Sequence, residues 1–160
     1  MQEFEVERVL GRGGFGITYL ARDMSLGRKV VIKENLPSSF AYRDSRRGTV
    51  CPQSEVGEDQ DNFAWSLDNF LREADTLASL AHPGIVAVLR KFEANGTAYF
   101  AMPYVEGLAL DELMRNRLER GEVPSDLEMR GLLERVLDAL AATLPVRIER
   151  RMAWWVSLEP

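Results

Sequence analysis

The chain has 160 residues, 46% of them hydrophobic, and its 20 Lys and Arg residues against 25 Asp and Glu residues give a formal net charge of −5. This length predicts one domain, or one domain with part of a second, and allows a substantial buried core. A single cysteine, Cys51, excludes an internal disulfide framework and favours a reducing compartment. The acidic balance argues against sequence-independent binding of nucleic acid, which needs a basic face.

The single histidine, His82, excludes a metal site built on a pair of histidines, and no metal site is predicted. The N-terminus is acidic and alternating, unlike a signal peptide, and no stretch reaches the roughly 18 apolar residues of a membrane span. The sequence therefore predicts a cytoplasmic protein without a membrane span.

The first third of the chain reads as strands followed by a long loop. Phe4 to Leu10, Ile17 to Ala21 and Lys29 to Lys33 are rich in apolar and β-branched residues and have short connections, with a turn over Asp23 to Gly27. They predict an antiparallel meander. Residues 36–62 are polar and predict a long irregular insertion.

Helical periodicity follows the insertion. Apolar residues from Leu67 to Ala78 recur at steps of three and four, which predicts a helix. Strands are then expected over residues 85–92 and 97–102, joined across Asn95-Gly96, a strong hairpin signal.

Two further helices are predicted. One covers Leu110 to Leu118 with Gly121 just past its end, and the other starts at Ser125 with Glu128 as its capping partner. The second helix carries an apolar stripe that ends at Pro145, where the pattern dissolves: Met129, Leu132, Leu133, Val136, Leu137, Leu140 and Leu144. The fold class is therefore α+β, a five-stranded antiparallel sheet with one packed helix, followed by two helices.

The glycine-rich stretch Gly11 to Gly16 allows three interpretations. It can be a flexible turn, or a dinucleotide-binding loop, although that motif must open a helix and here a strand follows. Between two strands, glycines also let backbone amides close over phosphates, with Phe15 at the tip shielding the site from water.

Lys33 ends an apolar strand, and Glu73 lies between Phe70 and Leu77 on a helix face that should be apolar. Either residue alone is commonly solvated. A buried ammonium needs an anionic partner, so we expect Lys33 to be buried beneath the glycine-rich loop and paired with Glu73.

The order of these motifs resembles the N-terminal lobe of a bacterial-type serine/threonine protein kinase over residues 4–144. The matching segments are LGRGGFGITYLA at 10–21, VVIK at 30–33, FLREA at 70–74, HPGIV at 82–86 and AYFAMPYVEG at 98–107. The resemblance implies ATP as the bound nucleotide, with Mg²⁺ in the family, and a kinase-like N-lobe followed by an incomplete C-lobe.

The resemblance also implies site residues. Lys33 would hold the α- and β-phosphates, oriented by Glu73. Met102 would be the gatekeeper and Pro103 to Val105 the hinge, while Leu10, Thr18 and Val31 would enclose adenine. Thr18 replaces the usual valine and Val31 the usual alanine, so Val31 is expected to crowd the base. The nucleotide-contacting set is Leu10, Gly11, Arg12, Gly13, Gly14, Phe15, Gly16, Ile17, Thr18, Val31, Lys33, Met102, Pro103, Tyr104 and Val105.

The motifs of the family's phosphotransfer chemistry are absent from these 160 residues, which contain no His-Arg-Asp, Asp-Phe-Gly or Ala-Pro-Glu. The resemblance thus implies a transferase family member whose chain alone does not transfer phosphate, because the catalytic loop and Mg²⁺ ligands are missing. Residues 1–107 would form the N-lobe and hinge, residues 108–144 the first C-lobe helices, and residues 145–160 a divergent tail, interpreted as an out-of-frame remnant or a genuine extension.

Two other interpretations remain open. The chain can be a non-catalytic kinase-like module that regulates another kinase, or, against the motif order, a small enzyme of another class. Self-association is expected through an apolar face formed by Met129, Leu133, Val136, Leu140, Trp154 and Trp155.

Overall fold

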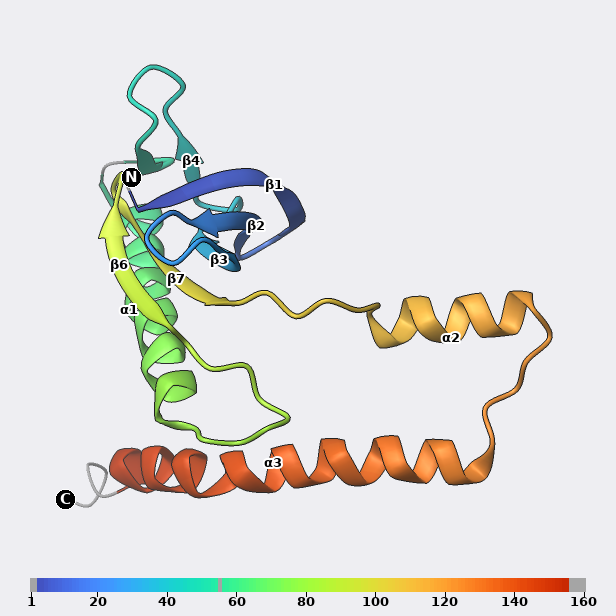
Figure 1. Ribbon diagram of the computed structural model, residues 1–160. Helices are drawn as coiled ribbons and strands as arrows, with labels where there is room; N and C mark the ends of the chain where they lie inside the picture. The colour runs from blue at the N-terminus through green and yellow to red at the C-terminus, as the bar shows by residue number, and fades with distance from the viewer. Residues whose placement is uncertain (1–2, 55, 156–160) are drawn as a thin grey trace. The chain divides into compact units, whose positions relative to one another are not determined.

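The computed structural model describes the backbone of residues 3–54 and 56–155, and the side chains of those residues up to Leu144. The chain divides into two compact units (Figure 1). The first unit comprises residues 1–79 and 86–104, and the second comprises residues 80–85 and 105–160.

The first unit contains the predicted five-stranded sheet, in the order β1-β2-β3-β7-β6. Every neighbouring pair of strands in it is antiparallel, as expected. The strands are β1 (Phe4–Gly13), β2 (Gly16–Asp23), β3 (Arg28–Asn35), β6 (Arg90–Ala94) and β7 (Thr97–Pro103).

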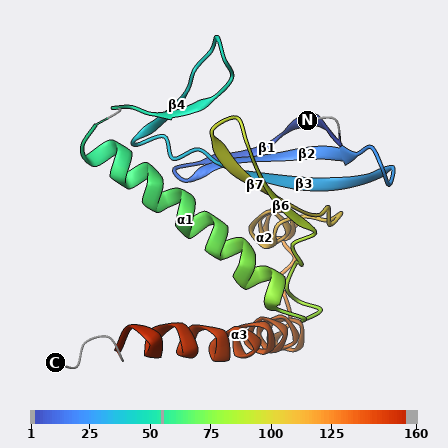
Figure 2. The same cartoon turned by 90° about the vertical axis from the view of Figure 1, so that its left-hand side faces the viewer.

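The alternation of side chains along the strands gives the sheet two apolar faces. One face carries Ala21, Val30, Ile32, Tyr99 and Ala101, with Phe4 and Phe92 from the two edge strands packed on them. The other face presents Ala98 and Phe100 to helix α1 (Glu58–Ser79), whose Phe70 and Ala74 complete a second cluster. Figure 2 shows α1 lying along this side of the sheet.

Helix α1 begins nine residues before the predicted start at Leu67. The extension is explained by Glu58, Asp59 and Asp61, which place negative charge in the first turn, where the helix dipole favours it. Strand β6 begins at Arg90 instead of the predicted Ile85. The reason is that residues 86–88 do not pair with β7. The hydrogen bonding to β7 begins only at Leu89, whose backbone amide donates to the Ala101 carbonyl.

The predicted irregular insertion at residues 36–62 contains regular structure. Strands β4 (Ala41–Arg43) and β5 (Val50–Pro52) pair in a small antiparallel hairpin. The last residues of the insertion, from Glu58 on, form the start of α1. The Asp44 carboxylate accepts the backbone amides of Arg46 and Arg47 and so shapes the hairpin tip. Three-residue strands are too short to produce a visible alternation in sequence, which is why the pattern missed them.

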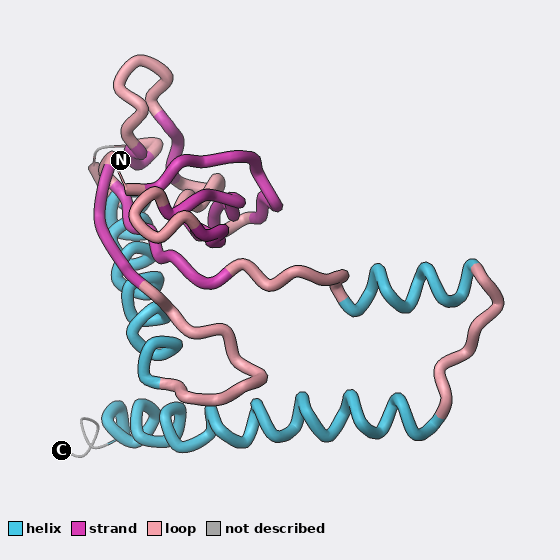
Figure 3. The backbone as a smooth tube through the Cα atoms, viewed as in Figure 1, coloured by secondary structure: helices cyan, strands magenta, loops and turns pink. Residues whose placement is uncertain are grey.

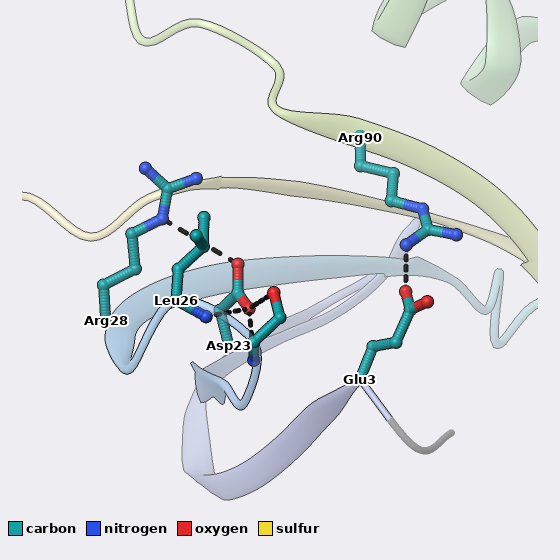
Figure 4. Close-up of polar contacts among 6 residues, drawn as sticks. Glu3, Asp23, Leu26, Arg28 and Arg90 are labelled. Carbon is teal, nitrogen blue, oxygen red and sulfur yellow. Dashed lines mark hydrogen bonds and ion pairs between the residues drawn. The ribbon is translucent and has the colours of Figure 1, made fainter.

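The two turns that the sequence predicted most strongly are present. Asn95 and Gly96 connect β6 and β7 with φ angles of 50° and 71°, as a type I′ turn requires. In the turn between β2 and β3, the Asp23 carboxylate accepts bonds from Ser25 and from the Leu26 amide, at 3.1 Å for the latter, and lies 3.8 Å from Arg28 (Figure 4). These hydrogen bonds, led by the Ser25 hydroxyl, lower the pKa of Asp23.

The second unit contains both predicted helices, α2 (Leu110–Glu119) and α3 (Asp126–Trp155), drawn in cyan in Figure 3. The capping box is confirmed, because the Glu128 carboxylate accepts the Ser125 amide at 2.9 Å and the Ser125 hydroxyl accepts the Glu128 amide. Helix α3 does not end at Pro145 as expected; an internal proline removes one backbone donor but does not by itself stop a helix.

The predicted apolar face of α3 is exposed where its side chains are described, at Met129, Leu133, Val136 and Leu140. The side chains of Trp154 and Trp155 lie outside the described residues. Within the described part of the chain, no helix has both the length and the apolar character that crossing a bilayer requires.

Candidate functional site

The glycine-rich loop is the tight connection between β1 and β2, with Gly13 paired to Gly16 across it. Phe15 stands at the tip with 79% of its surface exposed. A Cβ atom on Gly11, Gly13 or Gly14 would have no neighbour within 4 Å, so this backbone is open to an approaching group. A Cβ on Gly16 would lie 1.9 Å from the Glu34 carbonyl oxygen of β3. The close approach of β3 therefore leaves room only for glycine at position 16.

Lys33 and Glu73 form the expected ion pair, with 2.7 Å between the Lys33 Nζ and a Glu73 carboxylate oxygen. The Lys33 ammonium also lies over the rings of Phe70 and Phe100, 5.7 and 5.4 Å from their centroids. The expectation of a buried pair is wrong, since the Lys33 and Glu73 side chains are 31% and 47% exposed. An exposed pair leaves the ammonium accessible to a second anion.

The strand register gathers other predicted residues around Lys33. Thr18 pairs with Lys33 and Met102 pairs with Val31. Because side chains alternate along strands, Thr18, Val31, Lys33 and Met102 all belong to one face of the sheet. Leu10 is half-exposed on β1, the strand next to β2.

Ile17 and Arg12 are not on this face with Lys33. Ile17 is buried on the opposite side of β2 from Thr18, and with Arg12 and Gly13 it lines a cavity of about 330 Å³. The other wall of this cavity comes from the insertion, through Leu36, Ser38, Ala41 and Tyr42.

The predicted hinge crosses the boundary between the units. Pro103 pairs with Val30 at the end of β7, and Tyr104, the last residue of the first unit, has its ring 5.8 Å from the Lys29 ammonium. Val105 belongs to the second unit, so the structure does not place it among the residues around Lys33.

A cavity of about 220 Å³ adjoins the ion pair and includes residues that the sequence did not indicate. Its lining consists of Phe15, Lys33, Asn35, Trp65, Ser66, Asn69, Phe70 and Glu73. On α1, Trp65 lies about two turns before Glu73 and Asn69 about one turn before it. Their helical spacing to Glu73 was a usable signal, but only once α1 was known to start at Glu58.

Glu34 is a second charged residue of the site region that sequence reasoning missed. Its side chain is 1% exposed, accepts a hydrogen bond from the Tyr19 hydroxyl at 2.7 Å and forms an ion pair with Arg43 of the insertion. Burial, reinforced by the bond to Glu34, raises the pKa of Tyr19 to about 12. Burial also raises the pKa of Tyr99, which contacts the same carboxylate. A buried carboxylate is stable here because it has one cation and phenolic donors.

Comparison with known proteins gives a consistent result. The model of the family described as "Protein kinase domain" matches residues 4–144. The serine/threonine-protein kinase PknD of Chlamydia trachomatis is 31% identical over 147 residues, which cover 90% of this chain and 14% of that protein. PknD of Chlamydia caviae is 32% identical over 127 residues.

Solved structures are also similar, and two of them illustrate the likeness. The apo form of PpkA-294 shares 38% identity and a TM-score of 0.69, over 75% of this chain and 42% of that one. The PknI kinase domain of Mycobacterium tuberculosis shares the fold, with 23% identity and a TM-score of 0.60 over 88% of this chain and 47% of that one. The chain therefore spans less than half of the kinase structures it matches, and about a seventh of the curated relatives.

Proposed function

The chain belongs to the protein kinase family, and on this premise we propose that its first unit binds ATP through the glycine-rich loop and Lys33. The loop amides of Gly11 to Gly16 would cover the phosphates, Lys33 would hold the α- and β-phosphates, and Glu73 would orient Lys33. Thr18, Val31 and Met102 would contact the adenine ring, with backbone groups of residues 103–105 pairing to its edge.

The observation that carries this proposal is the ion pair of 2.7 Å between Lys33 and Glu73, on the face of β3 that adjoins the glycine-rich loop. A partly exposed ammonium that is already aligned by a carboxylate can contact a phosphate without a large desolvation cost. The open backbone at Gly11, Gly13 and Gly14 supports the same assignment, since phosphate oxygens approach such amides closely.

We propose further that the 160 residues by themselves do not transfer phosphate. In the family, Mg²⁺ bound to the phosphates neutralises charge that develops during transfer, and its protein ligands come from motifs that this sequence does not contain. The relatives are named serine/threonine kinases. We therefore propose serine or threonine specificity for any protein that combines the first unit of this chain with the missing catalytic and metal-binding motifs. The cytoplasmic location stays a prediction.

The alternative function is that of a non-catalytic kinase-like module that regulates another kinase. The exposed apolar residues Met129, Leu133, Val136 and Leu140 on α3 favour an interaction surface, and self-association through them stays a prediction. Binding of ATP that depends on Lys33 would favour the first proposal over this one.

Replacing Lys33 by alanine is expected to abolish stabilisation by ATP, because the variant loses the charge that holds the phosphates. With Mg-ATP at about ten times its Kd, the unchanged protein should melt about 2–6 °C higher than without nucleotide. Differential scanning fluorimetry measures this shift.

Lys91 provides the matched control, because it too pairs with a carboxylate of α1, Asp75. Lys91→Ala should retain the shift. An equal shift in the Lys33→Ala variant would show that Lys33 is not a phosphate ligand.

A further inference from the structure

We propose that Arg43 is a positioning residue for Lys33, and that the insertion at residues 36–62 is a brace that holds the end of β3 in register. This inference rests on the proposed ATP site, because it concerns the residue that would bind the phosphates. Three consecutive residues of β3 carry the argument: Lys33, Glu34 and Asn35.

Glu34 follows Lys33 directly and belongs to the opposite face of the sheet. Its carboxylate is almost completely buried, and Arg43 is the cation paired with it in the described structure. The same guanidinium donates to the Gly48 carbonyl at 2.6 Å, so Arg43 is fixed within its own hairpin. Any movement of this hairpin away from the sheet would leave the Glu34 charge buried without a cation.

Asn35 connects the same strand end to α1 and β7. Its side-chain oxygen accepts a hydrogen bond of 2.9 Å from Ser66, a buried residue two turns before Glu73 on α1. Its carbonyl accepts a bond from the Thr97 hydroxyl. The two residues that follow Lys33 are therefore linked to other elements, Glu34 to the insertion and Asn35 to α1, the helix that carries Glu73.

The hairpin of the insertion is attached to the sheet at a second point. Val50 donates its backbone amide to the Asn95 carbonyl at 2.7 Å. At Gly96 a Cβ atom would lie 2.6 Å from the Val50 carbonyl, so β5 contacts the β6–β7 turn where a side chain could not fit. Two attachments, at Glu34 and at Asn95, make the insertion a strap across β3 and β7.

The insertion also touches the glycine-rich loop. The Leu36 amide, at its first residue, donates to the Phe15 carbonyl at the loop tip over 3.3 Å. A shift of the end of β3 would therefore displace both proposed phosphate contacts, the Lys33 ammonium and the loop. Of the proposed adenine contacts, Thr18 pairs with Lys33, but Val31 and Met102 pair with each other two residues before it on β3. Adenosine binding should therefore be less sensitive to this shift than ATP binding.

The test compares the Kd of ATP with the Kd of adenosine, which lacks phosphates, by titration calorimetry at a temperature where circular dichroism shows each variant folded. In Arg43→Met, ATP binding should weaken about tenfold while adenosine binding stays within about twofold. Arg43→Lys, which keeps the charge but loses the forked donor, should show a smaller loss and serves if the methionine variant does not fold.

Arg47→Met is the matched control, because Arg47 lies exposed in the same hairpin loop. It should change neither Kd. Equal weakening of ATP and adenosine in the Arg43 variants, or no weakening at all, would overturn the positioning role.

If the proposed ATP site is itself wrong, the result is different, because the unchanged protein and the Lys33→Ala variant would then bind ATP with the same Kd. In that case amide hydrogen exchange still tests the brace. Residues 15–17 and 33–36 should exchange faster in the Arg43 variants than in Arg47→Met, and equal rates would refute the proposal.

Discussion

Replacing Gly16 by alanine is expected to destabilise the first unit and to weaken ATP binding together. The added Cβ would lie 1.9 Å from the Glu34 carbonyl oxygen and 3.2 Å from the Leu36 amide nitrogen. These are backbone atoms, so β2 and β3 must separate where Gly16 pairs with Asn35. Such overpacking costs about 1–3 kcal/mol in the free energy of unfolding, and chemical denaturation measures it.

Gly14→Ala provides the control for this substitution, since a Cβ at Gly14 has no neighbour within 4 Å. Its free energy of unfolding should change by less than about 0.5 kcal/mol, as is usual for exposed positions away from special contacts. Equal stability of the two variants would mean that the close approach between Gly16 and β3 is absent in solution.

The 160-residue chain is expected to show no phosphotransfer above background when incubated with Mg-ATP and a mixture of serine-, threonine- and tyrosine-containing acceptor proteins. In the family a catalytic-loop aspartate accepts the hydroxyl proton, and an asparagine and a further aspartate bind the metal ions. The sequence contains none of the motifs that supply these groups. The measurement is incorporation of radiolabelled phosphate over time.

A homologous kinase domain with both lobes serves as the positive control, and the Lys33→Ala variant of this chain identifies any contaminating kinase. Incorporation by the unchanged chain that disappears in the Lys33→Ala variant would contradict the account. It would mean that other carboxylates of this chain complete the reaction.

Strong local signals allowed much of the fold to be predicted from the sequence. The Asn95-Gly96 turn, the Ser125 and Glu128 capping box and the strands around Val30 to Ile32 all combine a local preference with a matching apolar pattern. Each depends on neighbours in the chain, so no knowledge of tertiary contacts was needed.

The remaining features depend on contacts between distant residues. Glu34 and Arg43 look like ordinary polar residues in the sequence. Their ion pair depends on the tertiary contact between β4 and the sheet, which the sequence pattern does not indicate. The exposure of Lys33 was also misjudged, because three apolar residues before it suggested burial on both faces of β3. In the structure α1 packs on one of these faces, yet the Lys33 side chain at the end of β3 remains partly exposed to solvent.

The insertion gives this sheet a support that the family motifs alone do not indicate. Its hairpin supplies the cation for a buried carboxylate next to the proposed phosphate-binding lysine, and it is tied to the β6–β7 turn. If the brace acts as proposed, residues 36–62 belong functionally with the glycine-rich loop, although none of them is a proposed ATP contact.

The most direct test of the ATP site is an NMR titration of the isotope-labelled chain with ATP. Amide shifts are expected to concentrate at residues 10–18, around Lys33 and at residues 102–105. The shifts at residues 11–16 should be lost when adenosine replaces ATP. No saturable shifts, or shifts confined to α2 and α3, would contradict the proposed nucleotide site.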